Sequence, residues 1–398
     1  MPRTPPLILR RSARHPLRRV ALLVETTRTY SRELLAGVRR YLAEHGPWST
    51  FIELRAYDST PPAWLRRWDG DGILTRTFTR EMADLITATG LPAVELRSSH
   101  LNQLPFVGMD NRLIGRMVAE HFLERGYRQF AAYRLHSERF FEERIDNFIA
   151  TVQAAGHSCA VLPEPVSDRV SDWEAGQARL IGWLGTLPKP VGIFAANDQL
   201  GVRVLDACQR AGIAVPEEVA VVGTENEETL CAFATPPLSS VQFDGATVGY
   251  RAAELLDRLM AGKGGNQGRP PTPTLVPPKG IIVRASSDDL VITDRLVAQA
   301  ARLIREQARS GISVKEVCRA LGTSRSTLER RMLAALQRTP KEEILRLRFR
   351  EIERLLRDTG LTIAAIAAQT GFAHSHYLQA AFKQRHGQTP GAFRRSAR

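Results

Sequence analysis

The C-terminal part of this chain contains one helical pattern twice, and this repeat restricts the possible folds more than any other feature. In each copy a hydroxyl residue, Ser313 or Thr362, precedes a short stretch with helical apolar spacing. Such residues cap a helix because the side-chain oxygen accepts an otherwise unpaired backbone N–H. A glycine follows in each copy, Gly322 or Gly371, and glycine tolerates the positive φ of a tight turn. Each copy therefore predicts a short helix, a glycine turn and a second helix.

The two copies differ by one residue. The turn glycines are 49 positions apart, whereas Leu328 and Leu378 are 50 positions apart, as are Met332 and Phe382. The second copy thus carries one more residue between its turn and its second helix. This order of elements is typical of helix-turn-helix units, whose second helix enters the major groove of DNA. We expect two unequal units of this kind at residues 294–398, although two helical hairpins of an ordinary bundle would give the same pattern.

Basic charge is concentrated in the same region. Residues 290–398 contain 21 basic and 9 acidic side chains, whereas residues 20–289 contain 28 basic and 33 acidic ones. Residues 1–19 contain six arginines and no acid, and we expect a basic disordered tail there. A basic domain beside a slightly acidic body is expected of a protein that binds a polyanion.

The body between residues 20 and 287 shows alternating strand and helix signals. Short apolar runs, such as residues 20–24, 51–54 and 191–195, are separated by amphipathic stretches. This alternation favours parallel sheets covered on both faces. A second series starts near residue 130, and two such lobes leave a cleft at the carboxyl ends of their strands. Polar residues stand at these ends, at positions 25–27, 110–111, 197–198 and 225–226.

Three motifs make the body similar to a known family. They are residues 107–111 (Val-Gly-Met-Asp-Asn), 192–198 (Gly-Ile-Phe-Ala-Ala-Asn-Asp) and 211–223. They resemble the lactose/galactose-repressor and periplasmic sugar-binding family over nearly all of residues 20–287. The resemblance implies a two-lobed, type I periplasmic-binding-protein-like α/β sensor domain, followed by the all-α domain. It also implies a small-molecule sugar effector in the cleft.

The same resemblance implies ligand-binding residues. Those matching the family positions that hydrogen-bond sugar hydroxyls are Asp110, Arg144, Asn197 and Glu225, whose groups accept or donate such bonds. Asp198 is a further candidate, and it is equally suited to cap the helix that follows. Arg144 is also compatible with a surface position on its helix. Glu225 stands where the family usually has Asp, so we expect a reshaped pocket there.

The duplicated unit resembles the DNA-binding domain of the AraC/XylS regulators. The matching residues are Ile366-Ala367, Gly371-Phe372, Tyr377-Leu378, Phe382-Lys383 and Gly387-x-Thr389-Pro390. This resemblance implies binding to double-stranded operator DNA. One departure is Ala373, which replaces the usual capping Ser and is expected to weaken the second helix of the second copy slightly.

Helical geometry predicts which side chains face the DNA. Leu328 and Met332 are four residues apart and must point inward together, as must Leu378 and Phe382. The outward or flanking candidates for DNA contact are Arg325, Ser326, Thr327, Arg330, His376, Gln379 and Lys383. Arginine suits a guanine edge and glutamine an adenine edge, while phosphate contact is the alternative that we favour for the basic residues.

Two connections complete the predicted organisation. Residues 340–358 are expected to form one long helix that joins the two units and holds their second helices about one DNA turn, ~34 Å, apart. Residues 288–293 are expected to form a short linker between body and basic domain. A short linker would transmit closure of the lobes to the DNA-binding domain.

Other classes of protein fit less well. The cysteines, Cys159, Cys208, Cys231 and Cys318, show no CxxC or Cys/His spacing, so we expect no metal, no cofactor and no catalytic residue. We also expect no membrane partner and a cytoplasmic location, because apolar runs are short and no secretory segment is evident. A solute-binding protein of a sugar transporter would not need the basic repeat. A methyl-transferring repair protein would need an activated cysteine.

A chain that combines these two domains resembles the xylose-operon transcriptional activator type of enteric bacteria. They imply a sugar-responsive transcription regulator of xylose or pentose genes, with D-xylose as its effector. A regulator of the same architecture that senses another sugar is the alternative. The implied partners are operator DNA, a second copy in a homodimer and, for an activator, RNA polymerase.

Overall fold

The computed structural model divides into two units, Met1–Asp289 and Leu290–Arg398. It describes residues 17–53, 60–98, 103–134, 139–162, 173–262, 272–288, 294–336 and 338–396. The predicted tail therefore lies outside the described residues up to residue 16, and the predicted linker lies outside them from residue 289 onward. Within these ranges, no helix is long and apolar enough to cross a membrane.

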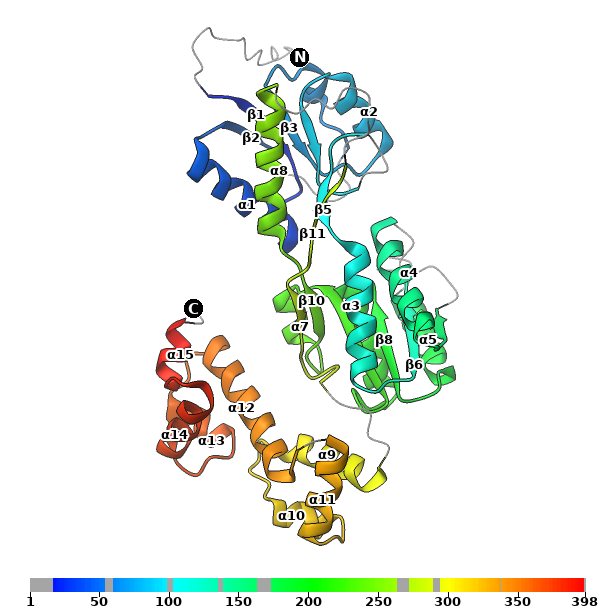
Figure 1. The fold of residues 1–398 in the computed structure, drawn as a ribbon, viewed down its shortest axis with the longest axis vertical. Coiled ribbons are helices and arrows are strands. Elements are labelled where there is room, and N and C mark those ends of the chain that lie inside the picture. The colour runs from blue at the N-terminus through cyan, green and yellow to red at the C-terminus, as the bar shows by residue number, and fades with distance from the viewer. Residues whose placement is uncertain are drawn as a thin grey trace, which may run out of the picture. The chain divides into compact units, whose positions relative to one another are not determined.

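The first unit contains two α/β lobes (Figure 1). The first lobe has a parallel sheet in the order β2-β1-β3-β4, comprising β1 (Arg19–Leu23), β2 (Ser49–Ile52), β3 (Gly72–Thr75) and β4 (Ala93–Glu95). Its helices are α1 (Thr29–His45), η1 (Ala63–Arg67), α2 (Arg80–Ala88) and, from later in the chain, α8 (Gly245–Met260), which packs along α1.

The second lobe has a sheet in the order β12-β10-β9-β8-β6-β7, in which only β12 is antiparallel to its neighbour. The strands are β6 (Gln129–Tyr133), β7 (Cys159–Val161), β8 (Val191–Ala195), β9 (Val219–Glu225), β10 (Ser239–Gln242) and β12 (Gly280–Ile282). The helices are α3 (Asn111–Glu124), α4 (Arg139–Ala154), α5 (Trp173–Thr186), α6 (Asp198–Arg210) and α7 (Glu228–Phe233).

Extended segments connect the lobes. β5 (Val107–Met109) and β11 (Thr274–Val276) pair in parallel, and in Figure 1 they run between the two sheets. The chain also returns to the first lobe between β10 and α8. Since several separate segments join the lobes, relative motion of the lobes requires all of them to bend together.

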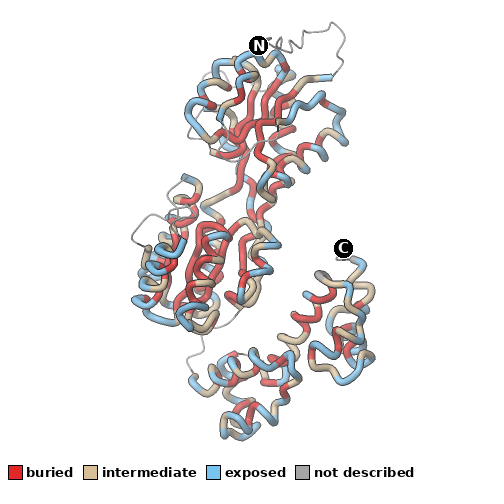
Figure 2. The backbone as a smooth tube through the Cα atoms, turned by 180° about the vertical axis from the view of Figure 1, so that it is seen from behind, coloured by how far each residue is buried: buried red, intermediate tan, exposed pale blue. Residues whose placement is uncertain are grey.

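The central strands are buried, as Figure 2 shows, and this confirms the expectation of sheets covered on both faces. All residues of β3, β4 and β8 are buried. β2 differs from the expectation, because it begins at Ser49 instead of residue 51 and is exposed along its length. It lies at the edge of its sheet, where only one neighbouring strand covers it.

The second unit is all helical. Its helices are α9 (Arg295–Gln307), α10 (Val314–Ala320), α11 (Arg325–Leu336), α12 (Pro340–Asp358), α13 (Ile363–Gln369), α14 (Ser375–His386) and α15 (Pro390–Ser396). One core surrounds Leu328 and Met332, and another surrounds Leu378 and Phe382. The long helix α12 has the predicted bounds and contributes to both cores, so it joins the two halves of this unit.

Local details of the repeat are confirmed. Ser313 and Thr362 accept backbone N–H groups at the starts of α10 and α13. Gly322 and Gly371 both have positive φ, 59° and 72°. α11 begins three residues after its turn glycine and α14 begins four residues after, which is the additional residue of the second copy.

Candidate ligand cleft and nucleic-acid interface

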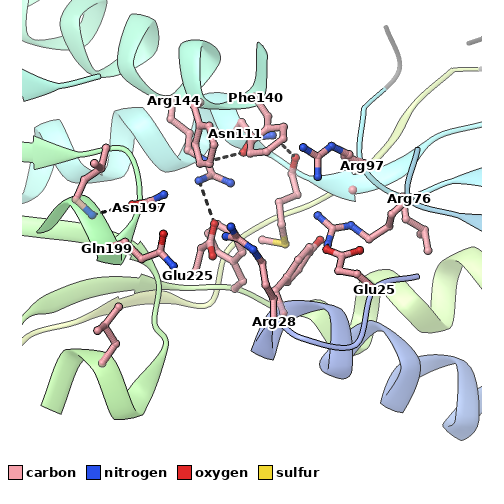
Figure 3. Close-up of a pocket in the computed structure, with 18 of the residues that line it drawn as sticks. Glu25, Arg28, Arg76, Arg97, Asn111, Phe140, Arg144, Asn197, Gln199 and Glu225 are labelled. Atoms are coloured by element: carbon pink, nitrogen blue, oxygen red, sulfur yellow. Dashed lines mark hydrogen bonds and ion pairs between the residues drawn. The ribbon is translucent and has the colours of Figure 1, made fainter. Parts of the chain in front are cut away.

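A cavity of about 590 Å³ lies between the two lobes of the first unit (Figure 3). This volume falls within the roughly 300–1,000 Å³ that is typical of small-molecule sites. Its polar lining from the first lobe comprises Glu25, Arg28, Tyr30, Arg76 and Arg97, and from the second lobe Asn111, Arg144, Asn197, Gln199, Arg203 and Glu225. Aromatic side chains, Phe106, Phe140, Phe141, Trp173 and Phe243, also line it. The cavity thus offers both hydrogen-bonding and apolar surfaces to a ligand.

Arg144 of α4 is the central cation of the second-lobe wall and is only 3% exposed, so the surface alternative for this residue is wrong. Its Nε donates to Asn111 Oδ1 at 2.8 Å, and its Nη1 donates to the Ala196 carbonyl and the Thr224 hydroxyl, both at 3.0 Å. Nη1 also lies 3.7 Å from Glu225 Oε1. Burial lowers the pKa of Arg144, while the Glu225 carboxylate opposes this change.

Glu225, at the end of β9, has an unusual backbone conformation. Its φ is 99°, and that of Asn226 is 50°. Residues other than glycine in this region are strained by about 1–3 kcal/mol each, and such strain is common at ligand sites. Two contacts hold Asn226: its N–H donates to Ser240 Oγ at 3.0 Å, and its Oδ1 accepts from Arg284 at 2.8 Å. The strained turn therefore fixes the position of the Glu225 carboxylate at the cavity wall.

Asn197 lines the cavity, whereas its neighbour Asp198 does not. Asn197 Oδ1 accepts from the Leu200 N–H at 2.9 Å and so caps α6, the role that was the alternative to ligand contact for Asp198. Asp198 is 2% exposed and accepts from Ser240 Oγ at 2.5 Å and from the Glu227 N–H at 2.8 Å. Its carboxylate thus supports the turn that carries Glu225 from behind.

Asp110, a predicted ligand contact, lies at the start of α3. It caps α3 by accepting from the Leu113 N–H at 2.9 Å and is not among the lining residues. The next side chain, Asn111, reaches the cavity instead and contacts Arg144. α3 can approach α4 this closely because of Gly115, where a Cβ atom would lie 2.1 Å from the Arg144 carbonyl oxygen. We therefore replace Asp110 with Asn111 in the candidate site.

The first-lobe wall was largely missed by sequence reasoning. Glu25 follows β1, Arg76 follows β3 and Arg97 follows β4, so all three lie just beyond the carboxyl ends of neighbouring strands. A polar residue directly after a strand is the sequence signal for such a position, and of these three residues our prediction included only Glu25. Arg97 stacks on Phe78, with 3.8 Å between its guanidinium carbon and the ring centroid. Cations from both lobes therefore face one cavity.

In the second unit, the predicted inward and outward faces of α11 and α14 are confirmed. Leu328, Met332, Leu378 and Phe382 are fully buried. The outward candidates Arg325, Ser326, Arg330, His376, Gln379 and Lys383 are exposed, and Thr327 is half-buried. Both second helices thus present polar side chains to solvent.

Some of these candidates are engaged within their own helix. Ser324 caps α11 by accepting from the Thr327 N–H at 3.1 Å, and its hydroxyl contacts those of Ser326 and Thr327. Arg325 pairs with Glu329 at 2.8 Å. His376 stacks on His374, with ring centroids 5.4 Å apart. The N-cap of α14 is His374, one residue after the cap position predicted at Ala373, and its side chain makes no capping hydrogen bond.

The side chains of Arg330, Gln379 and Lys383 make no hydrogen bond or ion pair within the described part of the chain. They require no rearrangement before contacting another molecule. These three residues are therefore the most available of the candidates for DNA contact.

Comparisons with known proteins agree with this architecture. Residues 119–287 match the periplasmic binding protein-like domain, and residues 317–396 match a helix-turn-helix domain. The xylose operon regulatory protein of Haemophilus influenzae is 31% identical over 94% of this chain and 98% of its own length. That of Escherichia coli K12 is also 31% identical, over 94% of this chain and 96% of its own length. The solved structure of a xylose-binding transcription activator matches with a TM-score of 0.74 and 30% identity, covering 95% of this chain and 98% of that one.

The fold and these similarities define a DNA-binding transcription regulator with a sugar-sensing domain of the periplasmic-binding-protein type. The relatives are regulators and not enzymes. The chain belongs to the family of xylose operon regulatory proteins.

Proposed function

We propose that the cavity between the lobes binds D-xylose and that binding alters the affinity of the C-terminal unit for operator DNA. The observation that carries the proposal is the Arg144–Glu225–Asn111 cluster, which lines a cavity of sugar size in a chain with two exposed second helices. Family membership makes D-xylose the first candidate. A pentose or hexose of another kind is the alternative.

The second-lobe cluster has the groups that sugar hydroxyls require. The Nε and Nη1 groups of Arg144 donate hydrogen bonds to other residues of the protein, whereas its Nη2 makes no hydrogen bond within the described ranges. Nη2 can therefore donate to a ligand hydroxyl, while the Glu225 carboxylate accepts from one. Asn197 lines the same wall. We assign Arg144, Asn111, Asn197 and Glu225 as effector contacts, with Asp198 and Asp110 supporting them.

Coupling follows from the position of the cavity between two lobes. A ligand that touches both lobes binds the closed arrangement more tightly than the open one, and only this difference shifts the equilibrium. Closure then changes how the DNA-binding unit engages its operator. In this scheme Arg330, Gln379 and Lys383 contact DNA directly, with Arg325, Ser326, Thr327 and His376 beside them.

The remaining partners come from family membership. We propose that the protein acts in the cytoplasm as a homodimer and activates genes for xylose use together with RNA polymerase. Two copies would place four helix-turn-helix units on the operator, which favours sites with repeated sequence elements.

A thermal-shift screen against pentoses and hexoses tests the effector assignment. A ligand that binds only the folded state raises the melting temperature, and the increase grows with the logarithm of the ratio of ligand concentration to dissociation constant. We expect D-xylose to raise the melting temperature of the unsubstituted protein most. The same concentration of D-xylose should not change the melting temperature of the Arg144→Met variant. If no sugar in the panel stabilises the unsubstituted protein, the sugar-sensing proposal is wrong.

A further inference from the structure

The first unit ends in a short segment, Arg284–Ser287, that hydrogen bonds hold against the second lobe. We call it the exit segment, because the chain passes from it into the DNA-binding unit. Ser286 and Ser287 are fully buried. The Ser286 hydroxyl donates to the Val221 carbonyl at 2.7 Å, and the Val221 N–H donates to the Ser286 carbonyl at 2.8 Å. The exit segment is therefore anchored to β9, the strand that ends at Glu225.

Arg284 connects the exit segment to the strained turn at the cavity wall. Its Nη2 donates to Asn226 Oδ1 and its Nη1 donates to the Leu238 carbonyl, both at 2.8 Å. Its backbone N–H donates to Ser239 Oγ at 2.8 Å, and the same hydroxyl donates to the Arg284 carbonyl at 2.9 Å. Asn226 directly follows Glu225, which lines the cavity. A ligand that shifts the Glu225 backbone therefore also shifts the acceptor of the Arg284 side chain.

The helix α3 provides a second connection between the cavity and the exit segment. At its start, Asn111 accepts from Arg144 in the cavity wall, and near its end His121 Nε2 lies 2.9 Å from Ser287 Oγ. Arg125, directly after α3, donates from Nε to the Ser287 carbonyl at 3.1 Å. An α-helix rises about 1.5 Å per residue, so this stiff element spans ~15 Å between Asn111 and His121. In Figure 1, α3 runs along the second lobe away from the first lobe.

The turn formed by Glu225 and Asn226 has the property that a coupling element requires. Two distant sites are coupled through an element with two arrangements that both sites bias. Both residues have positive φ, a conformation that residues other than glycine keep only while neighbouring contacts hold it. On one side the proposed effector contacts Glu225, and on the other side Arg284 contacts Asn226. Ligand contact therefore favours one arrangement of the turn, and the Arg284 side chain links that arrangement to the exit segment.

We infer that Arg284 is a positioning residue that couples the effector cavity to the DNA-binding unit by setting the position of the exit segment. Arg284 does not line the cavity, so it acts only through the residues that it holds. Arg125 fixes the other end of the exit segment and should act in the same way. The route lies within the second lobe, so it adds to the effect of lobe closure. The inference rests on the proposed function, because it assigns the route by which the proposed effector changes DNA affinity.

The test measures the affinity of the full chain for its selected DNA duplex, with and without a saturating concentration of the sugar that binds best in the thermal-shift screen. Asn226→Gly removes the acceptor of Arg284, while glycine keeps the positive φ. Asn226→Asp is the conservative variant, because aspartate tolerates this conformation and still accepts from Arg284. We expect sugar to change DNA affinity by at least about fivefold in the unsubstituted protein and in Asn226→Asp, but by less than about twofold in Asn226→Gly.

Arg284→Met and Arg125→Met extend the test to the exit segment. Both should reduce the effect of sugar on DNA affinity to less than about twofold, although calorimetric titration should still detect sugar binding. Combining Arg284→Met with Asn226→Gly should cause no further loss, because both substitutions remove the same hydrogen bond. The control is Arg210→Met, which removes surface ion pairs with Glu174 and Asp206 on the same lobe and should keep the full effect of sugar.

The outcomes distinguish coupling from a purely structural role. A full effect of sugar in Arg284→Met and Asn226→Gly, with or without a lower melting temperature, would overturn the inference. An equal loss of the effect in Asn226→Asp and Asn226→Gly would also overturn it, because the hydrogen bond from Arg284 would then not be the determinant. An unsubstituted protein whose DNA affinity responds to no sugar would instead overturn the proposed function.

Discussion

Arg348 Nη1 donates to the carbonyl oxygen of Gly371 at 3.2 Å and thereby ties the long helix α12 to the turn of the second helix-turn-helix unit. Its Nε and Nη2 donate to the carbonyls of Ala308 and Ile312 in the first half of the domain, at 2.9 and 3.0 Å. The two halves also meet at glycines, since a Cβ atom on Gly371 would lie 2.7 Å from the Gly311 Cα. One side chain of α12 thus fixes how the two helix-turn-helix units of the C-terminal domain are arranged.

Arg348→Met should lower the stability of the C-terminal unit. The substitution keeps much of the aliphatic packing but leaves three partly buried carbonyl groups without this donor, so we expect a loss of about 1–3 kcal/mol in the free energy of unfolding. Denaturant unfolding of the full chain measures it. Arg302→Met, which removes an exposed pair with Glu306, is the control and should change little. Equal stabilities of the two variants would contradict the role of Arg348.

Asp110→Ala and Asn111→Ala should have different effects although the residues are adjacent. Asp110 caps α3, so its loss should lower the free energy of unfolding by about 0.5–2 kcal/mol. Asn111 holds the buried Arg144 guanidinium at the cavity, so its loss should weaken sugar binding more than stability. Unfolding and calorimetric titration of both variants check this. Stronger loss of sugar affinity in Asp110→Ala would restore the role predicted from the sequence.

Asp198 should make the sensor domain less stable as pH rises. Burial raises its pKa from the usual 3.8 to about 7, against the opposing hydrogen bond from Ser240. The folded state therefore holds a proton that the unfolded chain releases. The stabilisation is complete below about pH 4 and is lost as pH rises through about 7. Asp198→Asn should flatten this decline in urea unfolding, and a parallel pH dependence in both proteins would contradict the assignment.

Arg330→Ala and Lys383→Ala should each weaken binding to a duplex selected by the protein from random sequences. If Lys383 contacts phosphate, its loss should reduce the salt dependence of log K by about one unit of slope and affect all sequences alike. If Arg330 reads a base, its loss should relax the preference at one position. Fluorescence anisotropy measures both effects.

The control is Arg302→Ala, which also removes one positive charge, but from α9. This variant should bind the duplex nearly as well as the unsubstituted protein. Unchanged affinity in both test variants would refute the assigned DNA-binding face.

Sequence reasoning succeeded where the determinant was local. The caps Ser313 and Thr362, the turn glycines and the bounds of α12 all depend on residues a few positions apart. At Asp110 the motif does not show which of two adjacent polar side chains caps the helix and which lines the cavity, and the structure places Asp110 at the cap and Asn111 in the cavity lining. Sequence reasoning missed the ion pair of Glu25 and Arg76 because those residues are 51 positions apart and meet only through the pairing of β1 and β3. The short helix α15 was not anticipated.

The most direct test of the account is the affinity of the full chain for its selected DNA duplex with and without saturating D-xylose. We expect the sugar to change the dissociation constant by at least about fivefold, within the usual range of coupling between sites. The Arg144→Met variant should bind the duplex as the unsubstituted protein does without sugar, and sugar should not change its affinity. DNA affinity that is unaffected by a sugar shown to occupy the cleft would contradict the central claim.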